Sequence, residues 1–214
     1  MNKLRWTLLV LLVVPIAASA QGPGVFALRT MLQDKNPEIR MKAAEGLGRV
    51  GGRQGIIILR QGLSDKSPTV RIAVVEALGF IGGRLSMRVL SAALKDKSPQ
   101  VRIRAVEALK DAGTVNSIPI IQKAFGDKEE SVRMHAALML KVIGHRRGVP
   151  VLAKVAVDDK SSAVRAAAAA YLGKVGVKDR RAVGALAKVL EDKTPAVRIR
   201  AKEVLGHVLA KDFE

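Results

Sequence analysis

The stretch DKSPTVRIAVVEALGFIG, which runs from Asp65 to Gly82, decides the fold of this protein. Its first seven residues recur, with small changes, five more times along the chain. The other copies begin at Asp34, Asp96, Asp127, Asp159 and Asp192. Successive copies are 31, 31, 31, 32 and 33 residues apart. Six copies at a nearly constant period indicate a tandem array of one small structural unit.

Each copy has the pattern of an amphipathic helix. In the quoted stretch Val70, Val74, Ala77, Leu78 and Ile81 are apolar at helical spacing. The predicted helix begins after a residue that can accept a hydrogen bond from a free backbone N–H. These predicted N-caps are Asn36, Ser67, Ser98, Ser161 and Thr194, and proline follows four of them. The predicted helix ends at a glycine, which is Gly51, Gly82, Gly113, Gly144 or Gly176.

A shorter apolar segment lies between these helices and completes a helical hairpin. Residues 54–63, 85–94, 117–125 and 149–157 are predicted as these shorter helices. One hairpin cannot bury its apolar face alone, whereas stacked hairpins share a continuous core. Hydrophobic residues make up 49% of the 214 residues but aromatic residues only 3%. Alanine, valine and leucine must therefore fill the core, and they allow neighbouring helices to approach closely.

The motif D-K-S-P-x-V-R-x-x-A-x-x-A-L-G-x-I-G resembles the short HEAT-like repeat known from phycobilisome lyases. The resemblance covers about residues 24 to 210 and implies an all-α, right-handed α-α superhelix (solenoid) of six hairpins. The expected repeats are 24–50, 53–82, 84–113, 115–144, 146–176 and 178–210. Fold does not define function here, because proteins with this repeat include lyases, scaffolds and DNA-repair enzymes.

The first twenty residues have the pattern of a cleavable signal peptide. Lys3 and Arg5 precede an apolar run from Thr7 to Ile16, and 18–20 is the small-residue sequence Ala-Ser-Ala. The run is shorter than a membrane span of about 20 residues. We therefore expect an exported chain, periplasmic or secreted, that starts at residue 21 and has no transmembrane span. Loss of Lys3 and Arg5 lowers its formal net charge from +18 to +16.

The repeated aspartates and arginines are expected to be structural. The resemblance implies a ladder in which they join the turn of each repeat to its neighbour, and the guanidinium fork suits such a bond. The ladder residues are Asp34, Arg40, Asp65, Arg71, Asp96, Arg102, Asp127, Arg133, Asp159, Arg165, Asp192 and Arg198.

A surplus of basic charge remains once the ladder is set aside. A lysine occupies the same turn position in all six repeats: Lys35, Lys66, Lys97, Lys128, Lys160 and Lys193. Arg146, Arg147, Arg180 and Arg181 add basic clusters at turns between repeats. Such a row of like charge suits lipopolysaccharide, an acidic wall polymer, an anionic lipid or, least expected, nucleic acid. The alternative is that these lysines are simply solvated.

The helices that begin at the repeated motif carry the other candidate surface. In HEAT-like stacks the second helix of each hairpin lines the concave side, and the residue after each repeated arginine is apolar here. The predicted partner-binding residues are Met41, Ile72, Phe80, Ile103, Arg104, Met134, His135, Leu138, Val142, Ile199 and Arg200. An apolar stripe with charged borders suits a protein partner. Alternatively, the residues after the arginines pack between repeats as ordinary core.

No set of residues in the sequence predicts catalysis or a cofactor. The absence of cysteine excludes disulfides, thiolate metal sites and a cysteine nucleophile. Some HEAT-like relatives are iron hydroxylases that use His-Glu dyads, but Ala136, Arg146 and Val208 follow the three histidines. DNA glycosylases of this fold need aromatic residues around a flipped base, whereas the only Trp lies in the predicted leader. We expect a non-enzymatic scaffold that binds a protein, with polyanion binding as the alternative.

Overall fold

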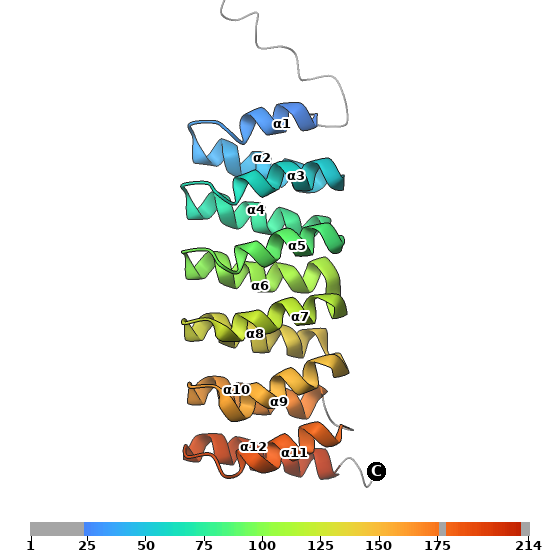
Figure 1. The fold of residues 1–214 in the computed structure, drawn as a ribbon, viewed down its shortest axis with the longest axis vertical. Helices are drawn as coiled ribbons and strands as arrows, with labels where there is room; N and C mark the ends of the chain where they lie inside the picture. Colours follow the sequence, from blue (N-terminus) through green and yellow to red (C-terminus); the bar gives the residue numbers. More distant parts are fainter. Residues whose placement is uncertain (1–23, 176–178, 211–214) are drawn as a thin grey trace, which may run out of the picture.

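The computed structural model describes residues 24–175 and 179–210 of the chain. Within these ranges the protein is a single-file stack of helical hairpins (Figure 1). The predicted leader and the predicted terminal glycine Gly176 lie outside the described residues. No helix in the described ranges is long and apolar enough to cross a membrane.

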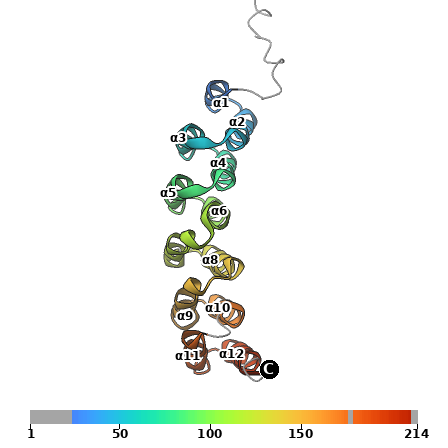
Figure 2. The same cartoon turned by 90° about the vertical axis from the view of Figure 1, so that its right-hand side faces the viewer.

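The helices form two parallel rows (Figure 2). The outer row consists of α1 (Val25–Met31), α3 (Gly52–Gly62), α5 (Gly83–Ala93), α7 (Ile118–Ile121), α9 (Val149–Asp158) and α11 (Arg180–Val189). The inner row consists of α2 (Pro37–Val50), α4 (Pro68–Ile81), α6 (Pro99–Gly113), α8 (Glu130–Ile143), α10 (Ser162–Val175) and α12 (Pro195–Ala210). The stack curves gently, and the inner row lies on its concave side (Figure 2). This architecture is the all-α solenoid that the repeats predict.

The core is a continuous strip between the two rows. The first five inner helices each place one leucine at the same repeat position in this strip, and these leucines are completely buried: Leu47, Leu78, Leu109, Leu140 and Leu172. The corresponding Leu205 of α12 is only partly buried. The outer row contributes Leu59, Leu90, Ile121, Leu152 and Leu186, which are also completely buried. Each repeat therefore buries its apolar side chains against its own hairpin and its neighbours, as stacked repeats do.

Small residues set the spacing of the first inner helices. A Cβ placed on Gly48 would lie 3.1 Å from the Cβ of Ala77, on α4. A Cβ on Gly79 would lie 2.9 Å from the Cβ of Ala108, on α6. Both distances are shorter than ordinary carbon–carbon contacts, so a larger side chain would force the helices apart. The low aromatic content thus follows from how closely the inner helices pack.

The starts of the inner helices differ in part from the prediction. The Asn36 side chain accepts a hydrogen bond from the Glu38 N–H, as predicted for an N-cap. Ser67 makes no such bond with its side chain, and its hydroxyl pairs with that of Thr69. The ladder aspartates instead accept from the N–H two residues further on, which is an Asx turn. These N–H groups belong to Asn36, Ser67, Ser98, Glu129, Ser161 and Thr194.

The fourth outer segment is the other difference from the prediction. A continuous helix was expected over residues 117–125, but only the short α7 is α-helical there. It lies between two 3-10 segments, η1 (Thr114–Ser117) and η2 (Gln122–Gly126). Pro119, which has no N–H to donate, lies within the first two positions of α7. This irregular segment borders the groove described below.

Candidate functional site

Five of the repeated arginines form paired hydrogen bonds with the aspartate of the next repeat. Nε and one terminal nitrogen donate to the two carboxylate oxygens, with donor–acceptor distances of 2.6 to 3.1 Å. The pairs are Arg40–Asp65, Arg71–Asp96, Arg102–Asp127, Arg133–Asp159 and Arg165–Asp192. All five arginines are buried, with exposed fractions of 2–5%. Such planar, two-point pairs fix both distance and orientation between repeats.

The third guanidinium nitrogen closes the turn of the arginine's own repeat. In Arg102 this nitrogen donates to the carbonyl oxygens of Asp96, at 2.8 Å, and Lys97, at 3.4 Å. The same two bonds occur in all six repeats. Each internal arginine thus joins two successive turns, and all three of its nitrogens donate to groups of the protein itself.

Four of the paired aspartates have a lowered pKa, which favours the carboxylate form. Hydrogen bonding from Arg165 lowers the pKa of Asp192 from its ordinary value of 3.8 to about 2, against an opposing effect of burial. For Asp65, Asp96 and Asp127 burial alone would raise the pKa. Hydrogen bonds from the arginine and from a backbone N–H outweigh burial and leave the pKa below its ordinary value. These groups are committed to the ladder.

The two ends of the ladder are incomplete. Asp34 belongs to the first turn, and the Asn36 N–H donates to its carboxylate. Arg198 belongs to the last turn and donates to the carbonyls of Asp192 and Lys193, with no carboxylate bound within the described residues. The ladder therefore has an acceptor available at one end of the stack and donors at the other.

The six lysines of the predicted row are all exposed. Their turns lie along one edge of the stack, at the start of each inner helix (Figure 1). In each of the last five turns, an arginine neutralises the aspartate next to the lysine. The lysine charge is therefore the one left facing solvent. Arg146, Arg147, Arg180 and Arg181 follow the ends of inner helices, on the opposite edge. The structure thus separates the predicted polyanion-binding residues into two edges.

The apolar residues after the repeated arginines lie at the border of the core. Met41, Ile72, Ile103 and Met134 are half-buried and pack against core side chains, as does Leu138. Ile199, on α12, is 59% exposed, since no described helix packs beyond α12. Both predicted roles, groove wall and inter-repeat contact, are therefore compatible with where these side chains lie.

Three predicted residues of the inner helices are plainly open to solvent. Phe80 is 76% exposed, Val142 53% and Ile199 59%. Because three quarters of the Phe80 side chain stays in water, burial of its ring contributes little to folding. Exposed side chains of this kind are what a protein-binding surface requires.

Charged side chains link the inner helices beside these apolar residues. Arg104 on α6 pairs with Glu76 on α4 at 3.1 Å and with Glu107 in its own helix at 2.9 Å. Glu107 lies 3.6 Å from Nε2 of His135 on α8. Arg200, on α12, pairs with Glu203 in its own helix. Because these pairs are part-exposed, they contribute little to stability and offer both charges to a partner.

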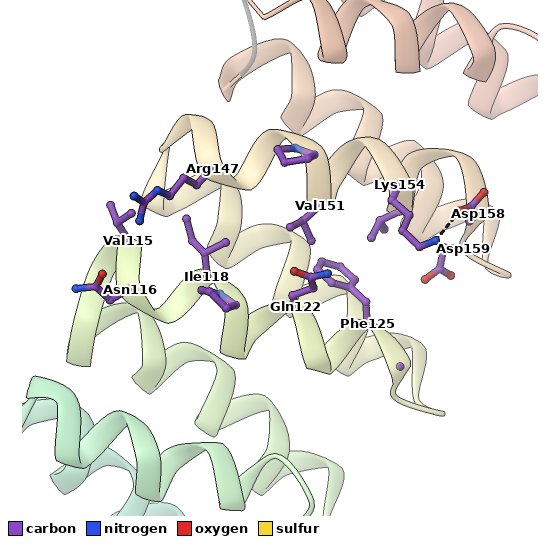
Figure 3. Close-up of a pocket in the computed structure, with 14 residues that line it drawn as sticks. Val115, Asn116, Ile118, Gln122, Phe125, Arg147, Val151, Lys154, Asp158 and Asp159 are labelled. Atoms are coloured by element: carbon purple, nitrogen blue, oxygen red, sulfur yellow. Dashed lines mark ion pairs between the residues drawn. The ribbon is translucent and has the colours of Figure 1, made fainter.

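The outer row contains a groove that the sequence did not reveal (Figure 3). It has a volume of about 660 Å³ and lies between the fourth outer segment and α9. Ile118, Phe125 and Val151 give it an apolar lining, and Arg147 stands at one end. Lys154 and Asp158, paired at 3.4 Å, stand at the other end (Figure 3). Two prolines that line the groove, Pro119 and Pro150, lie in the outer helices of adjacent repeats and are the only sequence features that could have pointed to it.

The histidines are not grouped. Nδ1 of His135 and of His207 bonds to the carbonyl oxygen four residues earlier in the same helix. Nδ1 of His145 accepts from the Arg147 N–H. Among the described residues no three His, Asp or Glu side chains are placed to hold a metal ion.

Comparisons with known proteins agree with the architecture. The family described as HEAT repeats matches residues 25–97, 86–173 and 149–212. The X-ray structure of Escherichia coli YibA is 24% identical with a TM-score of 0.55, over 89% of this chain and 75% of that one. Human deoxyhypusine hydroxylase in complex with glycerol is 21% identical with a TM-score of 0.52, over 88% and 86%. An engineered protein is 20% identical with a TM-score of 0.50, over 87% and 96%.

These structural likenesses concern the fold alone. No curated protein is significantly similar to the chain in sequence. The family match, in contrast, spans nearly all of the described residues. The period, the paired helices and the family match together show that this chain belongs to the HEAT-repeat family.

Proposed function

We propose that this protein is a non-catalytic scaffold that binds another protein along the inner helices. The observation that carries the proposal is the exposure of Phe80, Val142 and Ile199 on the concave row. Part-buried apolar residues and the ion pairs of Arg104 lie on the same helices. An apolar strip bordered by charges can bury its centre under a partner while its rim stays wet.

The export of the chain is part of this proposal. The apolar run before the small residues 18–20 supports a cleaved leader, which places the partner in the cell envelope or outside the cell. N-terminal sequencing of the accumulated protein tests this point, and a chain that starts at Gln21 is expected.

Phe80→Asp tests the binding surface. The side chain is largely exposed, so the variant should melt within about 2 °C of the unmodified protein. Recovery of the partner from solubilised envelope, washed at ~0.5 M salt, should fall at least tenfold. A photo-reactive amino acid at position 80 should crosslink to the same partner.

Val157→Asp is the matched control, since Val157 is also exposed, at 40%, but lies on outer helix α9. It should leave recovery of the partner unchanged. Equal loss in both variants, or loss in neither, would refute the assignment to the inner row.

The lysine row supports a second candidate function, which is electrostatic binding of a polyanion. All six lysines are exposed on one edge, and arginines neutralise the aspartates beside five of them. Binding of this kind weakens steeply with salt, whereas an apolar contact barely responds. If Lys66→Gln with Lys97→Gln and Lys128→Gln abolishes recovery and Phe80→Asp does not, the lysine edge is the working surface.

A further inference from the structure

The two rows of helices differ sharply in charge. The outer helices together with η2 carry ten Lys or Arg and one acidic residue, Asp158. The inner helices, with the six ladder arginines set aside, carry eight basic and seven acidic residues. The charge surplus is therefore not spread over the molecule: apart from the turns, it belongs to the outer, convex row.

The surplus is purest on the first three outer helices, α1, α3 and α5, which pack side by side and contain no Asp or Glu. Five exposed arginines project from them, and two exposed apolar side chains lie among these arginines. We call this surface the arginine face: Arg29, Arg53, Arg60, Arg84, Arg88, Phe26 and Ile57.

The repeat period places these side chains in rows. Arg53, Ile57 and Arg60 recur at helical spacing of four and three, so they share one side of α3. Arg29 and Arg60 occupy the same repeat position, 31 residues apart, as do Arg53 and Arg84. Neighbouring helices pack about 10 Å apart, so the arginines form rows of roughly that spacing along the outer surface.

The apolar members of this surface decide between its possible partners. Phe26 is 81% exposed and Ile57 is 52% exposed. A polyanion in water would pair with the arginines but would leave both apolar side chains in solvent. A phospholipid bilayer takes both, because its phosphates bind guanidinium groups and its interface accepts aromatic and aliphatic side chains. We propose that the arginine face docks on a bilayer that contains anionic phospholipid.

This arrangement leaves the inner row free. The arginine face and the inner helices lie on opposite sides of the stack (Figure 2), so a docked molecule presents its concave side away from the lipid. The proposal does not depend on what the inner row binds, since it uses none of the same residues.

Vesicle flotation tests the proposal, with the protein isolated from cells in the form in which it accumulates there. Vesicles of phosphatidylcholine with ~30% phosphatidylglycerol should bind the protein at ~0.1 M salt, and pure phosphatidylcholine vesicles should not. Each basic residue near such a surface contributes strongly to binding, so Arg53→Gln with Arg60→Gln, Arg84→Gln and Arg88→Gln should weaken it ~100-fold or more. The corresponding four Arg→Lys substitutions keep the charge and should retain most of the binding.

Two further variants distinguish docking through the arginine face from general electrostatic attraction of a basic protein to an anionic membrane. Changing Lys66, Lys97, Lys128 and Lys160 to Gln removes the same charge from the turn edge and should weaken vesicle binding less than tenfold. Phe26→Ser with Ile57→Ser, which leaves the net charge unchanged, should weaken it about tenfold. Equal loss in the arginine and lysine variants, no effect of the apolar pair, or binding to uncharged vesicles would each overturn the proposal. Retention on heparin in place of anionic vesicles would assign the face to a soluble polyanion instead.

Discussion

The arginine of each of the first five repeats performs two tasks with one side chain. Its fork holds the aspartate of the next repeat, while its remaining nitrogen holds two carbonyls of its own turn. Burying a charge is costly unless it is paired and hydrogen-bonded, and here every donor nitrogen is used. The repetition of this residue is therefore explained by the geometry of stacking, without any role in chemistry.

Arg102→Ala should lower the free energy of unfolding by about 3–5 kcal/mol, because it leaves Asp127 charged, 9% exposed and without its partner. Arg198→Ala is the matched control. Arg198 serves only its own turn, so its loss should cost about 1–2 kcal/mol. Urea denaturation followed by circular dichroism measures both. Equal costs for the two variants would mean that the bond between repeats adds nothing.

Acid should weaken the stack through the same residues. The pKa of Asp192 is lowered to about 2 in the folded protein, so the folded state binds this proton less readily than the unfolded chain does. Its contribution is complete above pH ~4 and is lost as the pH falls towards 2. The lowered pKa values of Asp65, Asp96 and Asp127 act in the same direction.

The urea midpoint should therefore be flat from pH 7 to 5 and fall steeply below pH 4. Asp192→Asn should lower the midpoint at pH 7 and reduce its fall in acid. An Asp192→Asn protein with an unchanged acid profile would show that the Arg165 pair is not responsible.

Between the first three inner helices the decisive feature is the glycine eight positions after the repeated arginine. Gly48 and Gly79 occupy this position on α2 and α4, and each faces an alanine of the next helix. Gly206 occupies it on α12, where nothing within the described residues lies within 4 Å of an added Cβ. This glycine position thus has a close neighbour on α2 and α4 and none among the described residues on α12.

Gly79→Ala should destabilise the protein by about 1–2 kcal/mol, since the added methyl would lie 2.9 Å from the Ala108 Cβ and 3.2 Å from its Cα. Gly206→Ala should stabilise it by about 0.5–1 kcal/mol, because alanine favours the helix and meets no neighbour. Thermal denaturation of both variants gives the comparison. A stabilised Gly79→Ala protein would contradict the close approach of α4 and α6.

Across the part of the stack that the structure describes, the main contacts of each repeat are with its neighbours. The ladder, the leucine strip and the glycine contacts all join adjacent hairpins. Stability in such arrays is approximately a sum of repeat terms and nearest-neighbour terms. Local damage should therefore have a local effect, in contrast to a globular domain with a single shared core.

Arg165→Ala provides the test, because Arg165 joins the fifth and sixth repeats through Asp192. Amide hydrogen exchange should accelerate at least tenfold in α11 and α12 and stay within twofold in α2, α4 and α6. Uniform acceleration along the chain would show that the stack unfolds only as one unit.

Much of this molecule could be predicted from the order of its residues. The period, the arginine and aspartate of each turn, and the apolar spacing specify six stacked hairpins, because those features act locally and repeat. The broken helix around Pro119 and the Asx turns at the helix starts were not predicted. There, local propensity competes with contacts made by the neighbouring repeat.

Only the folded stack decided which side chains are exposed to solvent. The sequence places an apolar residue after each arginine, but it does not say that Ile103 is covered by its neighbours while Phe80 and Ile199 face water. The sequence shows a surplus of basic residues. It does not show that the outer helices carry this surplus, or that basic and acidic residues are nearly equal in number on the inner helices. Helical spacing along one chain determines which residues share a side of a helix; which sides meet another helix and which meet solvent follows only when the hairpins pack.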